Sequence, residues 1–198
     1  QEKSGVIEIA FPSINIDFNT DGISHLLVNI MGGQMDINDI DKCQVLDIIF
    51  PDYVHKSFLG PKFGIKGIRE FTGVKDKPLF GAIVKPKSGL NIDQLTSIVT
   101  EMIDGGADFI KEDEILANTS YLPIHQRVDV ISDLIAKKNS KVVYSYCVNA
   151  DPIGLLDNLS DVIKMGGDCV HINFWSGLGA YTASNDYGLI THYQRSGI

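Results

Sequence analysis

The sequence predicts an α/β fold built on a parallel sheet. From residue 80 onward, apolar segments of strand length alternate four times with amphipathic segments of helix length. Consecutive strand–helix units of this kind imply parallel strands joined by right-handed crossovers. A helix end, a Gly-Gly pair, an Asp and an apolar strand occur in that order up to Ile110, and the same order recurs up to Ile172. Two architectures fit this pattern, a doubly wound sheet and a (β/α)8 barrel.

Each element has its own signal. The predicted strands cover residues 80–87, 108–113, 141–149 and 168–175, and the predicted helices cover 91–103, 123–138, 152–165 and roughly 183–194. In the second helix, Val128, Ile131 and Leu134 share one apolar face. The third helix begins with Asp151-Pro152, a cap followed by proline in the first turn. The glycine pairs let a helix turn tightly into the next strand.

Two further features favour the barrel. No Gly-x-Gly-x-x-Gly motif follows any predicted strand, which weakens the case for a dinucleotide-binding sheet. Charged residues gather where the first and second strands end, and barrel enzymes place their chemistry at the carboxyl ends of strands. We therefore expect residues 69–198 to form the first four βα units of a (β/α)8 TIM-type barrel.

The region before the barrel has a different character. Strands are predicted at 5–11 and 44–50, with helices at 21–31 and 63–72. Residues 1–68 are therefore expected to be part of a small α+β domain.

Composition limits the possible partners. The 198 residues carry a net charge of −8, which argues against nucleic acid or an anionic membrane as the main partner. The N-terminus lacks a signal-peptide pattern, and no apolar run approaches 18 residues. The three cysteines, Cys43, Cys147 and Cys169, show no metal or disulfide spacing, so we expect reduced thiols and a cytoplasmic protein.

The second predicted strand leads directly into four charged residues. On a strand, side chains two positions apart share a face, so Lys111 and Asp113 point the same way, and Glu114 lies at the rim. Magnesium prefers oxygen ligands and takes one or two protein carboxylates. The run therefore predicts a hard-cation site, with a solvated charge run as the alternative interpretation.

The first predicted strand ends in two lysines, Lys85 and Lys87, which also share a face. Two amines could bind a phosphate, or one could act as a base; solvated lysines before a turn are the alternative. Adjacent parallel strand ends would bring these lysines beside Asp113 and Glu114. With Mg²⁺ on the carboxylates and a lysine moving a proton, the reaction class that fits is proton abstraction next to a carbonyl.

Other polar or aromatic residues are expected to be structural. His171 and Asn173 alternate with apolar neighbours on the fourth strand, so we expect satisfied core groups, one of which could face the barrel mouth. Trp175 is expected to be a packing residue, and His192 a surface or packing residue on the last predicted helix.

The Lys85-Pro86-Lys87 segment, followed by the run from Gly105 to Glu114, resembles the large subunit of RuBisCO and its RuBisCO-like relatives. Gly-Pro-Lys-Phe-Gly-Ile at 60–65 supports the resemblance. It implies that Lys111 reacts with CO₂ to form a carbamate, which with Asp113 and Glu114 holds Mg²⁺. It also implies that Lys85 removes the proton that forms an enediolate, and that Lys87 assists.

The same resemblance extends to the N-terminal region. The segment containing Asn29 is similar to the one whose asparagine reaches into the partner subunit's site, which implies a ferredoxin-like N-terminal domain and at least a homodimer. Ile83 stands where carboxylases usually carry a threonine, so a RuBisCO-like enzyme acting on a phosphorylated, sugar-derived small molecule is preferred.

Three alternatives stay open at this stage. The first is an authentic ribulose-bisphosphate carboxylase that fixes carbon, and the second is a non-catalytic remnant or assembly partner. The third is an aldolase that uses Lys85 as a Schiff base without a metal. Because half a barrel would leave apolar edges open, we expect either a longer protein or two copies that complete each other.

Overall fold

The computed structural model describes residues 4–33, 37–58, 60–86 and 88–195. The chain divides into two compact units, residues 1–59 and residues 60–198. The domain limits proposed from the sequence, 1–68 and 69–198, stay a prediction.

The described part of the first unit includes α1 (Gly22–Met31) and the short 3₁₀ helices η1 (Ser13–Asn15) and η3 (Val54–Lys56). The predicted helix at 21–31 is confirmed. The strands predicted at 5–11 and 44–50 are wrong, since the described part of this unit contains no strand. A strand needs a hydrogen-bonded neighbour, and Ile7 and Ile49, in these segments, are 75% and 86% exposed. The ferredoxin-like domain stays a prediction.

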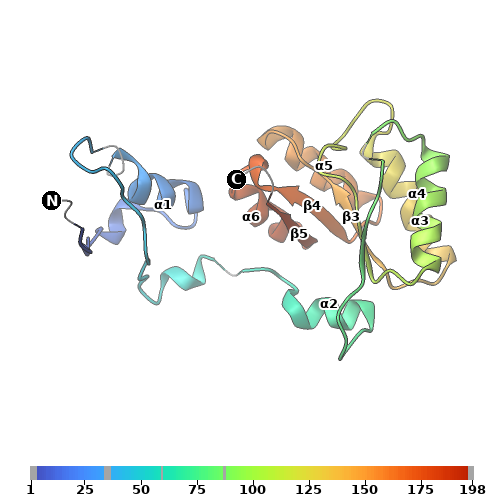
Figure 1. Ribbon diagram of the computed structural model, residues 1–198, viewed down its shortest axis with the longest axis horizontal. Helices are drawn as coiled ribbons and strands as arrows, with labels where there is room; N and C mark the ends of the chain where they lie inside the picture. Colours follow the sequence, from blue (N-terminus) through green and yellow to red (C-terminus); the bar gives the residue numbers. More distant parts are fainter. Residues whose placement is uncertain (1–3, 34–36, 59, 87, 196–198) are drawn as a thin grey trace. The chain divides into compact units, whose positions relative to one another are not determined.

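The second unit alternates helices and parallel strands, as Figure 1 shows. Its elements are α2 (Gly64–Thr72), β1 (Gly81–Ile83), α3 (Ile92–Asp104), β2 (Phe109–Lys111), α4 (Ile124–Lys137), β3 (Val143–Cys147), α5 (Pro152–Lys164), β4 (Cys169–Asn173), α6 (Gly179–Asp186) and β5 (Ile190–Gln194). The strands form one parallel sheet in the order β1-β2-β3-β4-β5. The predicted α/β class is confirmed, and the sheet is a five-stranded parallel half-barrel.

The end of this unit differs from the prediction. Residues 183–194 were expected to form one helix, but α6 ends at Asp186, and Ile190–Gln194 form a fifth strand paired with β4. Gly188 has a φ of +74°, a left-handed conformation that ends a helix. The strand that follows begins with the buried Ile190. His192 therefore lies on a strand, so its predicted place on a helix is wrong, whereas packing, one of its two predicted roles, agrees with the stacking of its ring on Phe109 at 5.3 Å between centroids.

The two faces of the sheet bury different sets of side chains. The main core lies between the sheet and helices α3 to α6, and Ile110 of β2 belongs to it. A smaller cluster on the other face joins Val143, Cys169 and Ile190, with Ile68 of α2 and Phe109 of β2 packed against it. Because alternate residues of a strand face opposite sides, β2 directs Lys111 to the same side as Phe109.

The helices are short. The longest one in the described part of the chain, α4, has 14 residues. Crossing a bilayer takes about 20 apolar residues in a helix. Among the described residues, none of the helices combines the length and apolarity that a membrane span requires.

Candidate active site at the carboxyl ends of β1 and β2

The register of the sheet brings the ends of β1 and β2 together. Ile83 pairs with Lys111, and the amide of Val84 donates to the carbonyl of Lys111 at 3.0 Å. Lys85 and Asp113 each lie two residues beyond these strands, on the same edge of the sheet. The charged ends of the two strands are therefore neighbours in space.

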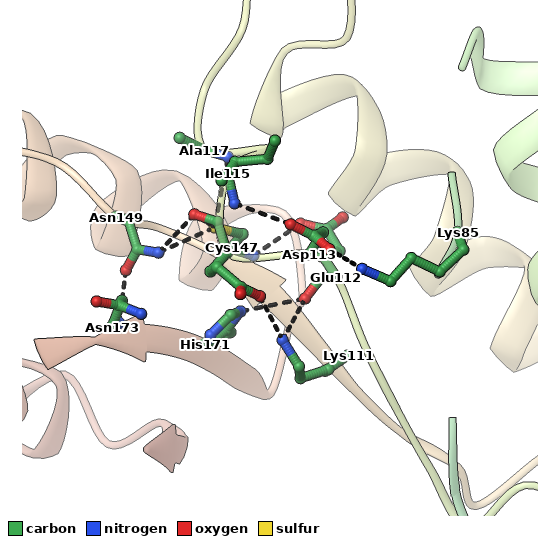
Figure 2. Close-up of polar contacts among 11 residues, drawn as sticks. Lys85, Lys111, Glu112, Asp113, Ile115, Ala117, Cys147, Asn149, His171 and Asn173 are labelled. Carbon is green, nitrogen blue, oxygen red and sulfur yellow. Dashed lines mark hydrogen bonds and ion pairs between the residues drawn. The ribbon is translucent and has the colours of Figure 1, made fainter. Parts of the chain in front are cut away.

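Two ion pairs occupy this edge (Figure 2). Lys85 Nζ contacts Asp113 Oδ2, joining the segment after β1 to the segment after β2. Lys111 Nζ lies 3.2 Å from Glu114 Oε2 and also donates to the carbonyl of Glu112 at 3.2 Å. The side chains of Lys111 and Asp113 are 4% and 3% exposed, while Lys85 is 56% exposed. The cluster thus runs from a buried centre to an exposed amine.

The neighbouring positive charges keep both carboxyl groups ionised. Burial raises the pKa of Asp113, but the hydrogen bonds from Lys85 and from the Ile115 amide outweigh it, so the pKa is lowered overall. The pKa of Glu114 is lowered first by a hydrogen bond from its own amide, and then, against the effect of burial, by Lys111. Two carboxylates are therefore available as oxygen ligands at neutral pH.

The structure does not test the roles predicted for two of the site residues, Lys87 and Asn29. Lys87 lies outside the described residues. Asn29 lies on α1 in the first unit, where its side-chain amide donates to the carbonyl of His25 at 3.0 Å. The roles proposed for both residues stay predictions.

A buried ion pair behind the cluster was missed. Glu112 received no role from the sequence, yet Arg127 Nε donates to its Oε1 at 2.9 Å, and both side chains are 0% exposed. Arg127 lies in the apolar stripe of α4 formed with Ile124, Val128 and Ile131. Strand alternation was the available signal: Lys111 and Asp113 on one face require Glu112 to face the helices.

Asn149 connects the ends of three strands. Its side-chain amide donates to the carbonyl of Glu114 at 2.9 Å, and its Oδ1 accepts from the Asn173 amide at 2.7 Å. Asn173 is buried and hydrogen-bonded through its own Oδ1 to the Trp175 amide, as expected for a satisfied group. Trp175 itself is 71% exposed, so most of this residue is not packed, contrary to the prediction.

His171 is buried beside the cluster. Its Nδ1 lies 3.2 Å from the carbonyl of Glu112, so the neutral ring carries its proton on Nδ1. Its Nε2 makes no hydrogen bond within the described residues, so only half of this histidine is satisfied. Burial, followed by the positive charge of Lys111 and by His192, lowers the pKa of His171 to about 3. The ring is therefore neutral at physiological pH.

The donor set fits Mg²⁺ on one condition. No group of three or more His, Cys, Asp or Glu side chains that could hold a metal ion occurs among the described residues. Asp113 and Glu114 supply two carboxylates, and the amine of Lys111 is the third side chain of the cluster. A carbamate on Lys111 would turn that amine into an oxygen ligand, which Mg²⁺ requires.

A charged cluster at the carboxyl ends of parallel barrel strands is the arrangement of a β/α-barrel enzyme. Residues 64–198 match the family model for the ribulose bisphosphate carboxylase large chain, catalytic domain, and the chain belongs to this family.

Similar proteins carry several activities. Over 96% of this chain, it is 33% identical to the 3-oxo-isoapionate-4-phosphate decarboxylase of Rhizobium rhizogenes, covering 46% of that protein. Over 88% of this chain, it is 29% identical to the 2,3-diketo-5-methylthiopentyl-1-phosphate enolase of Geobacillus kaustophilus, covering 42% of it. The chain spans about half the length of the curated relatives it matches.

Solved structures agree with this assignment. A rubisco-like protein from Burkholderia fungorum superimposes with a TM-score of 0.83 at 28% identity, over 94% of this chain and 47% of that one. The octameric ribulose-1,5-bisphosphate carboxylase/oxygenase of Pyrococcus horikoshii has a TM-score of 0.80 at 27% identity, over 92% of this chain and 45% of that one.

Proposed function

We propose that the protein is a RuBisCO-like enzyme that uses Mg²⁺ to enolise a phosphorylated, sugar-derived substrate. The convergence of Lys85, Lys111, Asp113 and Glu114 at one edge of the sheet carries this proposal. The decarboxylase and enolase named above both act on phosphorylated keto compounds and support the substrate class.

Each side chain has a task that its surroundings suit. Lys111 is buried beside Glu114, and as a neutral amine it would add CO₂ and release a proton to form the carbamate. Asp113 and Glu114 remain ionised and would complete the ligand set. Bound there, Mg²⁺ would polarise the substrate carbonyl and stabilise the negative charge that develops on its oxygen.

Lys85 is the base in this proposal. Its amine contacts Asp113 and its side chain is more than half exposed, so it can turn towards a bound substrate. As a neutral amine, it would take the proton from the carbon next to the carbonyl, and the electron pair would move onto the carbonyl oxygen. Lys87, two positions further along the chain, would assist.

We also infer at least a homodimer, in which Asn29 of one subunit would reach the site of its partner. The octameric state of the Pyrococcus horikoshii relative supports an oligomer.

The test uses three substrates and NMR detection in D₂O, with and without Mg²⁺. They are 3-oxo-isoapionate 4-phosphate, 2,3-diketo-5-methylthiopentyl 1-phosphate and ribulose 1,5-bisphosphate. The proposal predicts Mg²⁺-dependent exchange of the proton next to a carbonyl in at least one of the first two. Consumption of CO₂ with ribulose 1,5-bisphosphate would identify a carboxylase instead. No exchange with any of the three would favour a non-catalytic partner.

A further inference from the structure

The Glu112–Arg127 ion pair has no part in the chemistry proposed above. Both side chains are completely buried. A buried pair loses so much hydration that well-packed apolar residues often serve stability as well or better. The pair nevertheless lies directly behind the charged cluster, since Lys111 and Asp113 flank Glu112 in the chain.

The carboxylate of Glu112 is held from three sides. Oε1 accepts from Arg127 Nε at 2.9 Å and from the Tyr144 hydroxyl at 3.1 Å, and Oε2 accepts from the Cys147 amide at 2.7 Å. Burial, followed by the charge of Glu112, raises the pKa of Tyr144 well above its ordinary value, so the phenol stays a donor. These three hydrogen bonds hold the Glu112 side chain in one position.

The guanidinium of Arg127 holds the loop that follows β2. Nη1 donates to the carbonyl of Leu122, and Nη2 donates to the carbonyl of Ala117 at 2.6 Å and to that of Cys147 at 3.4 Å. One side chain of α4 thereby links Glu112, the loop after the candidate ligands and the end of β3.

The backbone of Glu112 connects the buried ion pair to the charged cluster. Its amide donates to Ser145 O at 3.1 Å. Its carbonyl accepts from the Lys111 amine and from His171 Nδ1, each at 3.2 Å, as Figure 2 shows. A rotation of the peptide between Glu112 and Asp113 would move the Lys111 amine away from Glu114 and would turn the backbone that carries Asp113.

We propose that Glu112 and Arg127 are positioning residues that hold Lys111, Asp113 and Glu114 in the arrangement that binds a divalent cation. This inference rests on the proposed function, because it requires the cluster to bind Mg²⁺. Groups that orient metal ligands typically change metal affinity by about 10–100-fold when they are removed.

The test measures the affinity of the full-length protein for Mn²⁺, a spectroscopic substitute for Mg²⁺, by electron paramagnetic resonance in bicarbonate buffer. The main variant replaces both charges, Glu112→Leu with Arg127→Met, so that no unpaired charge is left buried. It is expected to unfold cooperatively and to bind Mn²⁺ about 10–100-fold more weakly.

Two single variants separate positioning from general stability. Tyr144→Phe removes one donor to Glu112 and is expected to weaken Mn²⁺ binding severalfold. Tyr146→Phe, on the same strand, removes a hydroxyl that lies 3.0 Å from Ser132 Oγ and is not among the hydrogen-bond donors to the Glu112 carboxylate. Its Mn²⁺ affinity is expected to equal that of the wild type.

The outcomes are distinct. Wild-type affinity in a folded double variant overturns the inference. If the double variant does not fold, unchanged affinity in Tyr144→Phe overturns it, as do equal losses in Tyr144→Phe and Tyr146→Phe. A wild-type protein that binds no Mn²⁺ contradicts the proposed function itself.

Discussion

The charged side chains on the two sides of the segment that follows β2 differ in their exposure to solvent. On the helix side, Glu112 and Arg127 are fully buried, and the carboxylate receives three hydrogen bonds. On the other side, each of Asp113 and Glu114 is paired with a lysine, and the cluster opens to solvent through Lys85. Adjacent residues therefore have different roles. The buried Glu112–Arg127 pair (the closed side) fixes the backbone, and the cluster of Asp113 and Glu114 with their lysines (the open side) keeps groups that can exchange partners.

The largest expected effect comes from the open side. Lys85→Met removes the proposed base and should lower kcat for proton exchange by about 10²–10⁴-fold. Mn²⁺ affinity should be kept or improved, because Asp113 loses the amine that competes for it. Both are measurable by NMR in D₂O and by electron paramagnetic resonance.

Lys66→Met is the control for this variant, since the side chain of Lys66 is 89% exposed and pairs with Glu70 on the helix surface. It should leave the exchange rate unchanged. A Lys85→Met enzyme with the wild-type rate would remove Lys85 from the mechanism.

Changes to the buried Glu112–Arg127 pair should mainly lower the free energy of unfolding. Glu112→Gln leaves the charge of Arg127 buried without its partner and should reduce the free energy of unfolding by roughly 3–5 kcal/mol. Urea unfolding at pH 7.5 measures this loss. The exposed pair of Lys137 and Asp133 offers a matched control, and Lys137→Gln should cost no more than about 1 kcal/mol. Equal losses in the two variants would contradict the contrast between the two sides.

His171 lies at the boundary between the two sides and should make stability depend on pH. Its pKa is about 3 in the folded protein and close to 6.5 in an unfolded chain. The unfolded state therefore binds more protons between these values, and stability should fall as the pH drops below about 6.5. The contribution is at most about 1.4 kcal/mol per pH unit.

His171→Gln should remove part of this dependence between pH 6.5 and 5.5, and the rest comes from His192, whose pKa burial also lowers. This range stays above the ordinary carboxyl pKa values, so Asp113 and Glu114, whose pKa values are lowered, contribute little to the slope. Urea unfolding at several pH values is the measurement, with the exposed His125 replaced by Gln as the control. An unchanged slope in His171→Gln would mean that the buried ring is protonated without cost.

The smallest effect is expected at Asn149. Asn149→Ala removes the donor to the Glu114 carbonyl, one contact that holds a candidate ligand, and leaves the ion pairs in place. Mn²⁺ affinity should fall by about two- to tenfold, as one hydrogen bond of about 1 kcal/mol would allow. A loss of Mn²⁺ affinity larger than that of the Glu112 and Arg127 double variant would mean that Asn149 positions the candidate ligands more strongly than the buried ion pair does.

Much of the barrel region could be predicted because its signals are local. Amphipathic helices and apolar strands alternate from residue 80, and both glycine pairs lie at the turns that need them. The fifth strand was missed because Gly188 was not recognised as a helix end. The strands expected before residue 51 were wrong because strand formation depends on a partner that local sequence does not reveal.

The candidate site was predictable in part. The spacing of Lys111 and Asp113 on one strand, and of Lys85 after the previous strand, indicated their convergence. Glu112 and Arg127 belong to different elements. An arginine in the apolar stripe of a helix does not indicate, from the sequence alone, which residue it pairs with. Nor could the sequence show that the carbonyl of Glu112 accepts hydrogen bonds from both Lys111 and His171, because every residue has a backbone carbonyl and the residue type does not indicate its partners.

The most direct test of the central claim is ¹³C NMR of the full-length protein equilibrated with ¹³C-bicarbonate and Mg²⁺. If Lys111 completes a magnesium site with Asp113 and Glu114, a carbamate signal should appear, should depend on Mg²⁺, and should vanish in Lys111→Met. A wild-type spectrum without this signal, or a signal that persists in Lys111→Met, would contradict the proposed metal centre.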